Sequence, residues 1–302
     1  YGQRVDASGK KVGPWFSISS GPGNRFLPAV VYNSIEGLYL VVFMQDVSAA
    51  YDGSKYDIKG QFVGWDGVLL GAAFTIQTWD NSSFWSPRIV FNPVWNEYMV
   101  VWGGINTSTG LSSGIGMKKL NHYGNEIYGT IISADGYPTS PDIVWNPDLN
   151  NYLVVWESLN ASGKLNIMGQ LLDPAGNPLP SAGNPTIPPF TFGIYGSNTN
   201  HALSAHVAYS KGIYGVVFEY EYASNDHDIY MAYVFPDGSL ISPVLIDTTD
   251  DHDTHTAIAG SPHSTGQEFI ILFPRATVNG AQVWMRPITN YMASINREVC
   301  NY

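Results

Sequence analysis

The chain has 302 residues, a net charge of −11 and only 13% charged residues, so it lacks the basic surface that nucleic-acid binding requires. Its 14% aromatic residues, 31 Gly and 19 Pro exclude a disordered protein and favour many short strands joined by tight turns. A single cysteine, Cys300, excludes an intrachain disulfide, and the longest apolar runs, of about seven residues, fall far below the roughly 20 needed to span a membrane.

Residues 1–19 read as a hairpin, and five copies of a second kind of hairpin follow along the chain. Each copy has two apolar strands around an Asn or Gly turn, and its second strand closes on an aromatic residue. The copies lie at residues 30–43, 89–102, 143–156, 207–218 and 258–273, closing on Phe43, Trp102, Trp156, Phe218 and Phe273. They predict strand pairs that recur about every 57 residues, with the aromatic residues in the core.

Another hairpin follows each of the first four copies, at residues 58–76, 115–132, 167–187 and 229–246, and a last one is expected at 283–295. Two hairpins in each period give four antiparallel strands, and radial repetition of such sheets is a β-propeller. The predicted fold is therefore all-β, a five-bladed β-propeller of four-stranded antiparallel blades. Because the repeat runs through the whole chain, it predicts that residues 1–302 form one domain.

The repeat resembles one found in secreted and surface-exposed bacterial and archaeal proteins. In that family a Y-L-V-V-W strand precedes a D-I-Y-G-Q-R-apolar-D-x-x-G strand and turn. Here residues 152–156 read YLVVW before the hairpin at 167–176, and residues 1–9 read YGQRVDASG. The resemblance implies a propeller in an extracellular or cell-surface location, and it carries no catalytic motif.

Residues 1–19 supply one half-blade more than five blades need. The hairpin could close the ring within the molecule, or it could add to the sheet edge of a neighbouring molecule and build a filament or tube. A piece of a longer array is a third alternative. The second alternative predicts a homo-oligomer or polymer, with assembly residues Tyr1, Gly2, Gln3, Arg4, Val5 and Cys300.

The loops that enter the first strand of each blade are expected to converge near the propeller axis, where a ligand would bind. The candidate ligand-binding residues there are Arg25, Arg88, Asp142, His201 and His206. The position just before each first strand reads Ala29, Arg88, Asp142, His206 and Ala257, which offers a single carboxylate. A pair of catalytic acids is therefore not supported at this layer, and no serine-nucleophile motif occurs.

Residues 250–255 form the most polar run of the chain. Asp251, His252 and Asp253 could ligate a divalent cation from an extended segment, or they could simply be solvated. No standard metal motif accompanies them, and no other cofactor is expected.

Three Asn-x-Ser/Thr sequons, at Asn81, Asn106 and Asn160, fall in predicted turns and are candidate glycosylation sites. With the resemblance, they favour a secreted, non-enzymatic structural or adhesive propeller that self-assembles through its terminal strands. The alternative is a carbohydrate-binding or glycoside-hydrolase-like propeller that uses the axial loops, with glycans as partners.

Overall fold

The computed structural model of the chain describes residues 1–78, 80–134, 136–180, 191–223, 226–247, 255–261, 266, 268–277 and 280–289. Every regular element in these residues is a β-strand, which confirms the all-β prediction. They hold no helix with the length and apolar character to cross a membrane. The chain forms two compact units, Tyr1–Ala134 and Asp135–Tyr302.

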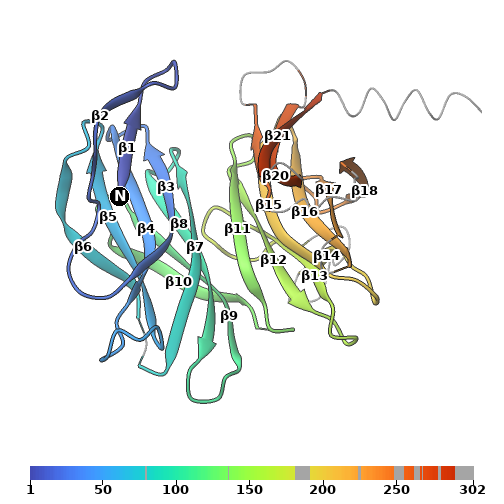
Figure 1. The fold of residues 1–302 in the computed structure, drawn as a ribbon, viewed down its shortest axis with the longest axis horizontal. Coiled ribbons are helices and arrows are strands. Elements are labelled where there is room, and N and C mark those ends of the chain that lie inside the picture. The colour runs from blue at the N-terminus through green and yellow to red at the C-terminus, as the bar shows by residue number, and fades with distance from the viewer. Residues whose placement is uncertain are drawn as a thin grey trace, which may run out of the picture. The chain divides into compact units, whose positions relative to one another are not determined.

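The first unit contains ten strands in three antiparallel sheets (Figure 1). A two-stranded sheet pairs β1 (Gly2–Val5) with β2 (Lys11–Phe16). Two four-stranded sheets follow in chain order, one of β3 (Arg25–Asn33), β4 (Leu38–Asp46), β5 (Tyr56–Gly64) and β6 (Leu69–Gln77), the other of β7 (Ser82–Asn92), β8 (Glu97–Asn106), β9 (Ser112–Asn121) and β10 (Glu126–Ser133).

The second unit continues the same pattern. Its strands are β11 (Thr139–Asn146), β12 (Asn151–Leu159), β13 (Leu165–Leu172) and β14 (Phe192–Tyr195), then β15 (Ala202–Ser210), β16 (Ile213–Ala223), β17 (Asp226–Val234) and β18 (Leu240–Asp247), then β19 (Ala257–Gly260), β20 (Glu268–Thr277) and β21 (Gly280–Thr289). The first two groups are four-stranded sheets, and the last has three strands in the described residues. Four sheets thus have the four-stranded form that the repeat predicts.

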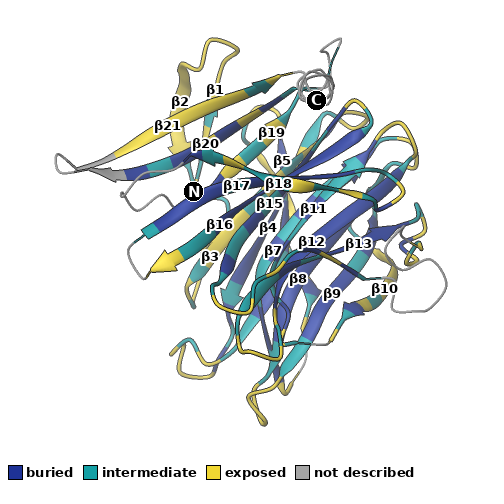
Figure 2. Cartoon of the chain, turned by 90° about the vertical axis from the view of Figure 1, so that its right-hand side faces the viewer, coloured by how far each residue is buried: buried dark blue, intermediate teal, exposed yellow. Residues whose placement is uncertain are grey.

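The second strand of each four-stranded sheet lies in the core. Strands β8 and β12 are buried along almost their whole length, whereas β2 is exposed, and Figure 2 shows this contrast in dark blue and yellow. All five closing aromatic residues are buried, Trp156 to within 1% of full burial. Their predicted role as core residues is confirmed.

An Asn at the end of the first strand ties neighbouring sheets together. The Asn146 Oδ1 accepts the backbone N–H groups of Asp148 and Leu149, which fixes the hairpin turn. Its Nδ2 donates to the Tyr214 hydroxyl in the next sheet at 3.0 Å. In the first unit, Asn33 and Tyr98 repeat the contact at 2.9 Å.

Each first strand is preceded or interrupted by a non-glycine residue with left-handed backbone geometry. These residues are Leu27, Ser86, Ser140, Ser204 and His255, with φ between 46° and 52°. In the four four-stranded sheets this residue falls inside a β-bulge, for example between Leu203 and His206. A bulge re-aims the neighbouring backbone amides, and these amides matter for the site described below.

The β1–β2 hairpin has the construction of the outer half of a sheet. The Gln3 Nε2 donates to the carbonyls of Arg4, Val12 and Gly13, as Gln61 does across β5 and β6. The hairpin is anchored where Phe16 and Ile18 pack against Val41, Phe43 and Val63. Whether its strands complete a sheet within or between molecules stays a prediction, and Cys300 lies outside the described residues.

Candidate functional site

Two buried glutamates occupy the same place in consecutive sheets of the second unit. Glu157 follows the closing aromatic Trp156 on β12, and Glu219 follows Phe218 on β16. Because side chains alternate along a strand, each glutamate points to the face opposite its aromatic neighbour. Glu157 is 8% exposed and Glu219 is 3% exposed, so both carboxyl groups are largely removed from water.

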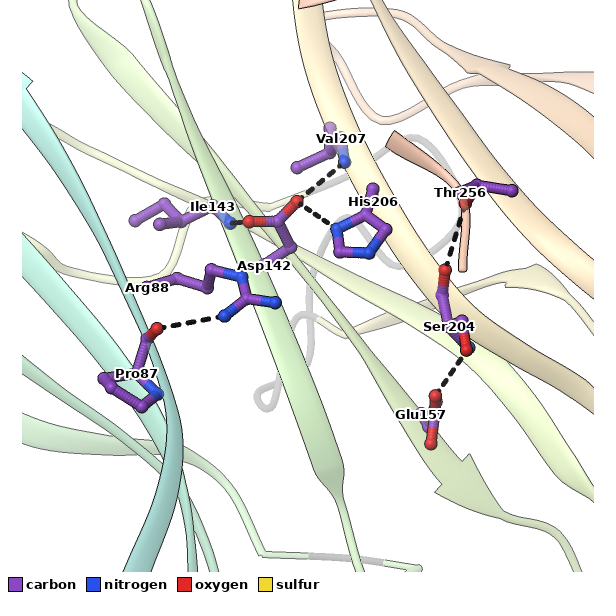
Figure 3. A network of polar contacts seen from close by, with 9 residues as sticks. All are labelled: Pro87, Arg88, Asp142, Ile143, Glu157, Ser204, His206, Val207 and Thr256. Atoms are coloured by element: carbon purple, nitrogen blue, oxygen red, sulfur yellow. Dashed lines mark hydrogen bonds and ion pairs between the residues drawn. The ribbon is translucent and has the colours of Figure 1, made fainter. Parts of the chain in front are cut away.

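Each glutamate accepts a hydrogen bond from a left-handed residue of the next sheet. The Ser204 N–H donates to Glu157 Oε1 at 2.6 Å, and the His255 N–H donates to Glu219 Oε1 at 2.7 Å. Figure 3 shows the first of these bonds and the Ser204 carbonyl, which accepts from the Thr256 hydroxyl. The left-handed residues Ser204 and His255 therefore hold both carboxyl groups in fixed positions.

The remaining oxygens of the two glutamates have different partners. The Glu157 Oε2 accepts from the Thr139 hydroxyl at 3.2 Å, a neutral donor. The Glu219 Oε2 lies 3.1 Å from Nδ1 of the buried His227, and the other ring nitrogen of His227 lies 4.0 Å from Glu221. Glu219 therefore lies beside a residue type that can carry a positive charge, whereas Glu157 accepts from the neutral Thr139 hydroxyl.

Asp142 forms a second acidic centre at the bulge of β11. Its Oδ2 accepts the Val207 N–H at 3.0 Å and lies 3.2 Å from His206 Nδ1, while its Oδ1 accepts the Ile143 N–H at 2.9 Å. Figure 3 shows the carboxylate reaching from β11 to His206 and Val207 of β15. This side chain is 15% exposed, so it is not fully removed from water.

Asp142 and Glu157 lie on the same face of the β11–β12 hairpin. Asp142 pairs with Val155, two residues before Glu157, and side chains two residues apart share a face. Both reach β15, where they bind the N–H groups of Ser204 and Val207. Those amides are three residues apart, a run of at most about 10 Å, and the left-handed Ser204 in the bulge shortens it, so the two carboxyl groups bind amides less than about 10 Å apart.

The environment raises the pKa of Glu157 above its ordinary value of 4.5. The main cause is burial, which disfavours the charged form, and the negative charge of Glu219 adds to it. The hydrogen bonds from Ser204 and Thr139 act in the opposite direction but do not cancel the shift. Glu157 is therefore a carboxyl group that retains its proton to higher pH than an exposed glutamate does.

Within the second unit the structure brings together Asp142 and His206, two of the five residues predicted to bind a ligand. Arg25 and Arg88 belong to the other unit. The Arg25 guanidinium is bonded to Ser19 Oγ and to the carbonyls of Gly21, Gly23 and Ser20, which orders the loop before β3. Arg88 donates to the Pro87 carbonyl at 3.1 Å (Figure 3).

His201, the fifth of these residues, lies in the loop before β15 in the second unit. Its Nδ1 accepts the Leu165 N–H at 3.1 Å, and its carbonyl accepts the Glu221 N–H at 3.0 Å. Its contacts therefore connect the loop before β15 to β13 and β16.

The predicted metal ligands Asp251, His252 and Asp253 lie outside the described residues. Within the described ranges no group of three His, Cys, Asp or Glu side chains is arranged to hold a metal ion. A divalent cation at residues 251–253 stays a prediction.

Neither Glu157 nor Glu219 is among the site residues predicted from the sequence. The signal lies in the residue after each closing aromatic, which reads Met44, Gly103, Glu157, Glu219 and Pro274 along the five repeats. The positions just before the first strands include one carboxylate, whereas the positions just after the closing aromatic residues include two. The prediction that no pair of catalytic acids is present considered only the first of these two sets of positions.

No model of a known protein family matches the sequence, and no curated protein does either. Solved structures do share the fold. A family-43 glycoside hydrolase, a β-1,3-galactosidase solved with galactodeoxynojirimycin, is 8% identical with a TM-score of 0.53 over 95% of this chain and 93% of its own. An exo-β-1,3-galactanase from Clostridium thermocellum is 10% identical with a TM-score of 0.51 over 96% of this chain and 62% of its own.

A third similar structure is an N-acetylgalactosamine deacetylase from F. plautii in complex with the blood group B trisaccharide. It is 8% identical with a TM-score of 0.52 over 91% of this chain and 92% of its own. At such identities the likeness concerns the fold, and it supports a propeller-like all-β architecture.

These likenesses correct the function predicted from the sequence. A non-enzymatic structural or adhesive protein was expected, and that prediction is wrong, because the fold is shared with glycoside hydrolases. Self-assembly into a polymer stays a prediction. The expectation of a non-enzymatic protein took the absence of a catalytic motif as the absence of a site. Two-carboxylate chemistry needs no contiguous motif, since its residues come from different strands.

The three sequons differ in how much room they leave for a glycan. Asn81 is exposed, and Asn106 lies at the end of β8, where its Oδ1 accepts the N–H groups of Ser108 and Thr109. The Asn160 Nδ2, the atom that a glycan would modify, donates to the Ser197 carbonyl at 2.7 Å and lies against Asn198.

When the chain is secreted from a eukaryotic host, we therefore expect glycans at Asn81 and Asn106 and none at Asn160. Glycopeptide mass spectrometry measures the occupancy of each site, and an Asn160→Gln variant should have the same glycan mass as the parent. Folded protein with Asn160 substantially occupied would contradict the expectation.

Proposed function

We propose that the chain is a glycoside-hydrolase-like enzyme that cleaves neutral polysaccharides, with Glu157 as general acid and Asp142 as general base. The observation that carries the proposal is the pair itself: one buried carboxyl group with a raised pKa, and one partly exposed carboxylate that accepts two backbone amides, on the same face of one hairpin. Environments that separate the behaviour of two carboxyl groups are how one site supplies an acid and a base.

We also propose that the five repeat sheets are blades of one propeller. The chain-order antiparallel sheets, the left-handed residue at the start of each repeat and the likeness to the hydrolases support it. The extracellular location inferred from the repeat is part of this proposal, since polysaccharides are extracellular substrates.

The proposed reaction uses the two carboxyl groups in one concerted step. Glu157 donates its proton to the glycosidic oxygen while a water molecule attacks the anomeric carbon, and Asp142 accepts a proton from that water. The bond between the anomeric carbon and the leaving oxygen breaks as the new carbon–oxygen bond forms. The proposed reaction requires the two carboxyl groups to lie about 6.5–9.5 Å apart, the spacing that leaves room for the water in inverting enzymes, and the run of less than about 10 Å between the amides that they bind is compatible with it.

The other residues of the site position these two groups. Glu219 adds negative charge that favours the protonated form of Glu157. His206 Nδ1 and the Val207 N–H hold the Asp142 carboxylate toward β15. Thr139 and Ser204 fix the orientation of the Glu157 carboxyl group.

The direct test is hydrolysis of defined polysaccharides by the purified chain. The structures that share the fold suggest the first substrate, β-1,3-linked galactan. We expect release of reducing sugar from at least one neutral β-linked glycan, and proton NMR of the first product should show inverted anomeric configuration. Folded protein that releases no sugar from a broad panel of neutral glycans would overturn the proposal.

A further inference from the structure

The first unit contains a pocket that the carboxylate site does not use. It has a volume of about 530 Å³ and is lined by residues of β6 to β10 and of the loops at Asn81 and Asn106. All of these residues belong to the unit Tyr1–Ala134, so the pocket is complete without the second unit. Its volume lies in the range of about 300–1,000 Å³ typical of small-molecule sites.

The floor of the pocket is apolar and aromatic. Phe84 and Trp102 meet edge to face with ring centroids 6.4 Å apart and are each 4% exposed, so only their edges reach the pocket, and Ile131, which is 54% exposed, adds open apolar surface. Gly116 is required beneath the indole, because a Cβ there would lie 2.5 Å from Trp102. The floor therefore cannot be altered cheaply, and it offers a firm surface to one apolar face of a ligand.

The pocket has almost no net charge. Its only ionisable lining residues, among those described, are Lys118 and Glu126, whose charged groups lie 2.8 Å apart. The Lys118 ammonium also donates to the Ile76 carbonyl at 2.8 Å. Since the two charges neutralise one another, an ionic ligand gains little here.

The rim carries amides and hydroxyls. They belong to Gln77, Asn81, Asn106, Ser113 and Thr130, all of which line the pocket. The Thr107 N–H donates to the Asn81 carbonyl at 2.8 Å, which holds the two asparagine loops together on one side of the opening. Groups of this kind both donate and accept hydrogen bonds, so they suit ligand hydroxyls.

We propose that this pocket binds a single neutral pyranose unit as a second, non-catalytic carbohydrate site. A pyranose has an apolar C–H face that can pack on Ile131 beside the ring edges of Phe84 and Trp102, and equatorial hydroxyls that fit the rim. A purely apolar ligand would leave the rim amides unpaired, and a charged sugar would find no free opposite charge. The site is independent of the Glu157–Asp142 pair, so binding here does not depend on hydrolysis.

The test is saturation-transfer NMR and calorimetry with methyl β-galactopyranoside, on protein made in a bacterial host so that Asn81 and Asn106 carry no glycan. We expect binding with a Kd of about 1 mM, a value usual for a single sugar unit with few contacts. The Thr130→Trp variant fills the pocket from the edge strand β10 and should weaken binding at least about tenfold. The matched control is Ile127→Trp, an exposed residue of the same strand that does not line the pocket.

Several results would overturn the proposal. They are the absence of binding at about 50 mM sugar, equal binding by Thr130→Trp and Ile127→Trp, or stronger binding of the corresponding uronic acid than of the neutral sugar. If Thr130→Trp unfolds, a Gln77→Ala variant provides a second test, because it removes a rim amide without altering the floor and should also weaken sugar binding. Binding that survives Glu157→Gln but not Thr130→Trp separates this site from the catalytic one.

Discussion

Replacing Glu157 by Gln is expected to lower the rate of polysaccharide hydrolysis by roughly 10²- to 10⁴-fold, the usual loss when a general acid is removed. Gln has the same shape and keeps an oxygen that can accept the Ser204 N–H, so the bulge of β15 should remain in place. The loss should therefore appear in kcat with little change in KM. The measurement is steady-state hydrolysis of the polysaccharide that the parent enzyme cleaves.

The leaving group provides a sharper version of the same experiment. A dinitrophenyl glycoside expels a weakly basic phenolate that needs no proton, so Glu157→Gln should cleave it almost as well as the parent does. Asp142→Asn should fail on both substrates, because activation of water is needed in either case. Equal losses on the two substrates in Glu157→Gln would contradict the role of general acid.

Stability should move in the opposite direction from activity. Because the pKa of Glu157 is raised in the folded chain, the folded state binds more protons than the unfolded state from about pH 4.5 up to that raised pKa. The free energy of unfolding contributed by this residue therefore falls as pH rises through that window. Glu157→Gln has no such titration, so its Tm at pH 7 should equal or exceed that of the parent.

A matched control for these measurements is Glu36→Gln in the first unit. Glu36 is exposed and accepts a hydrogen bond from the Asn96 side chain, so its replacement should change hydrolysis by less than about twofold and stability by less than about 1 kcal/mol. If Glu36→Gln were as inactive as Glu157→Gln, loss of a carboxylate as such, and not the site, would explain the result.

The strands could be predicted from the sequence because the residue pattern that identifies a strand is local. The run Tyr152–Trp156 is apolar, β-branched and aromatic, and it begins just after the turn that Asn146 and Asn150 form. Its identity as a buried central strand therefore needs no tertiary information. The same holds for the four-stranded sheets built from two successive hairpins.

The bulges were not accessible in this way. Ser204 and Ser140 adopt positive φ although serine is not a preferred left-handed residue, so no glycine marks the position. Their amides and hydroxyls gain partners only when a carboxyl group from another strand or sheet arrives. A register irregularity of this kind is set by tertiary contacts, and the sequence alone gives it no local signature.

Glu157 shows a different limit. Its type is visible in the sequence, but its chemistry depends on burial and on Glu219, which lies 62 residues later. A glutamate after a strand would normally be solvated at the sheet end. Only the folded arrangement of β12, β15 and β16 converts it into a carboxyl group with a raised pKa.

Replacing Asn146 by Leu is expected to lower the free energy of unfolding by about 3 kcal/mol, the largest stability effect of any polar residue discussed above. Asn146 is fully buried, and its loss removes the acceptor of two turn amides and the donor to the Tyr214 hydroxyl. Tyr214 keeps its bond to Asn151 at 2.8 Å, so its hydroxyl is left with one partner instead of two. Leu fills the space but pairs none of these groups.

Thermal unfolding measures the effect, and a fall in Tm of about 6–12 °C is expected for units of this size. Tyr214→Phe should cost less, about 1–2 kcal/mol, and the double variant less than the two single changes added together, because both remove the same bond. Asn33→Leu, which breaks the equivalent bond to Tyr98 in the first unit, should lower stability by a similar amount. If the Tm of Asn146→Leu matched that of the parent within about 2 °C, the asparagine would fix only the turn, and adjacent sheets would be held together by their apolar faces alone.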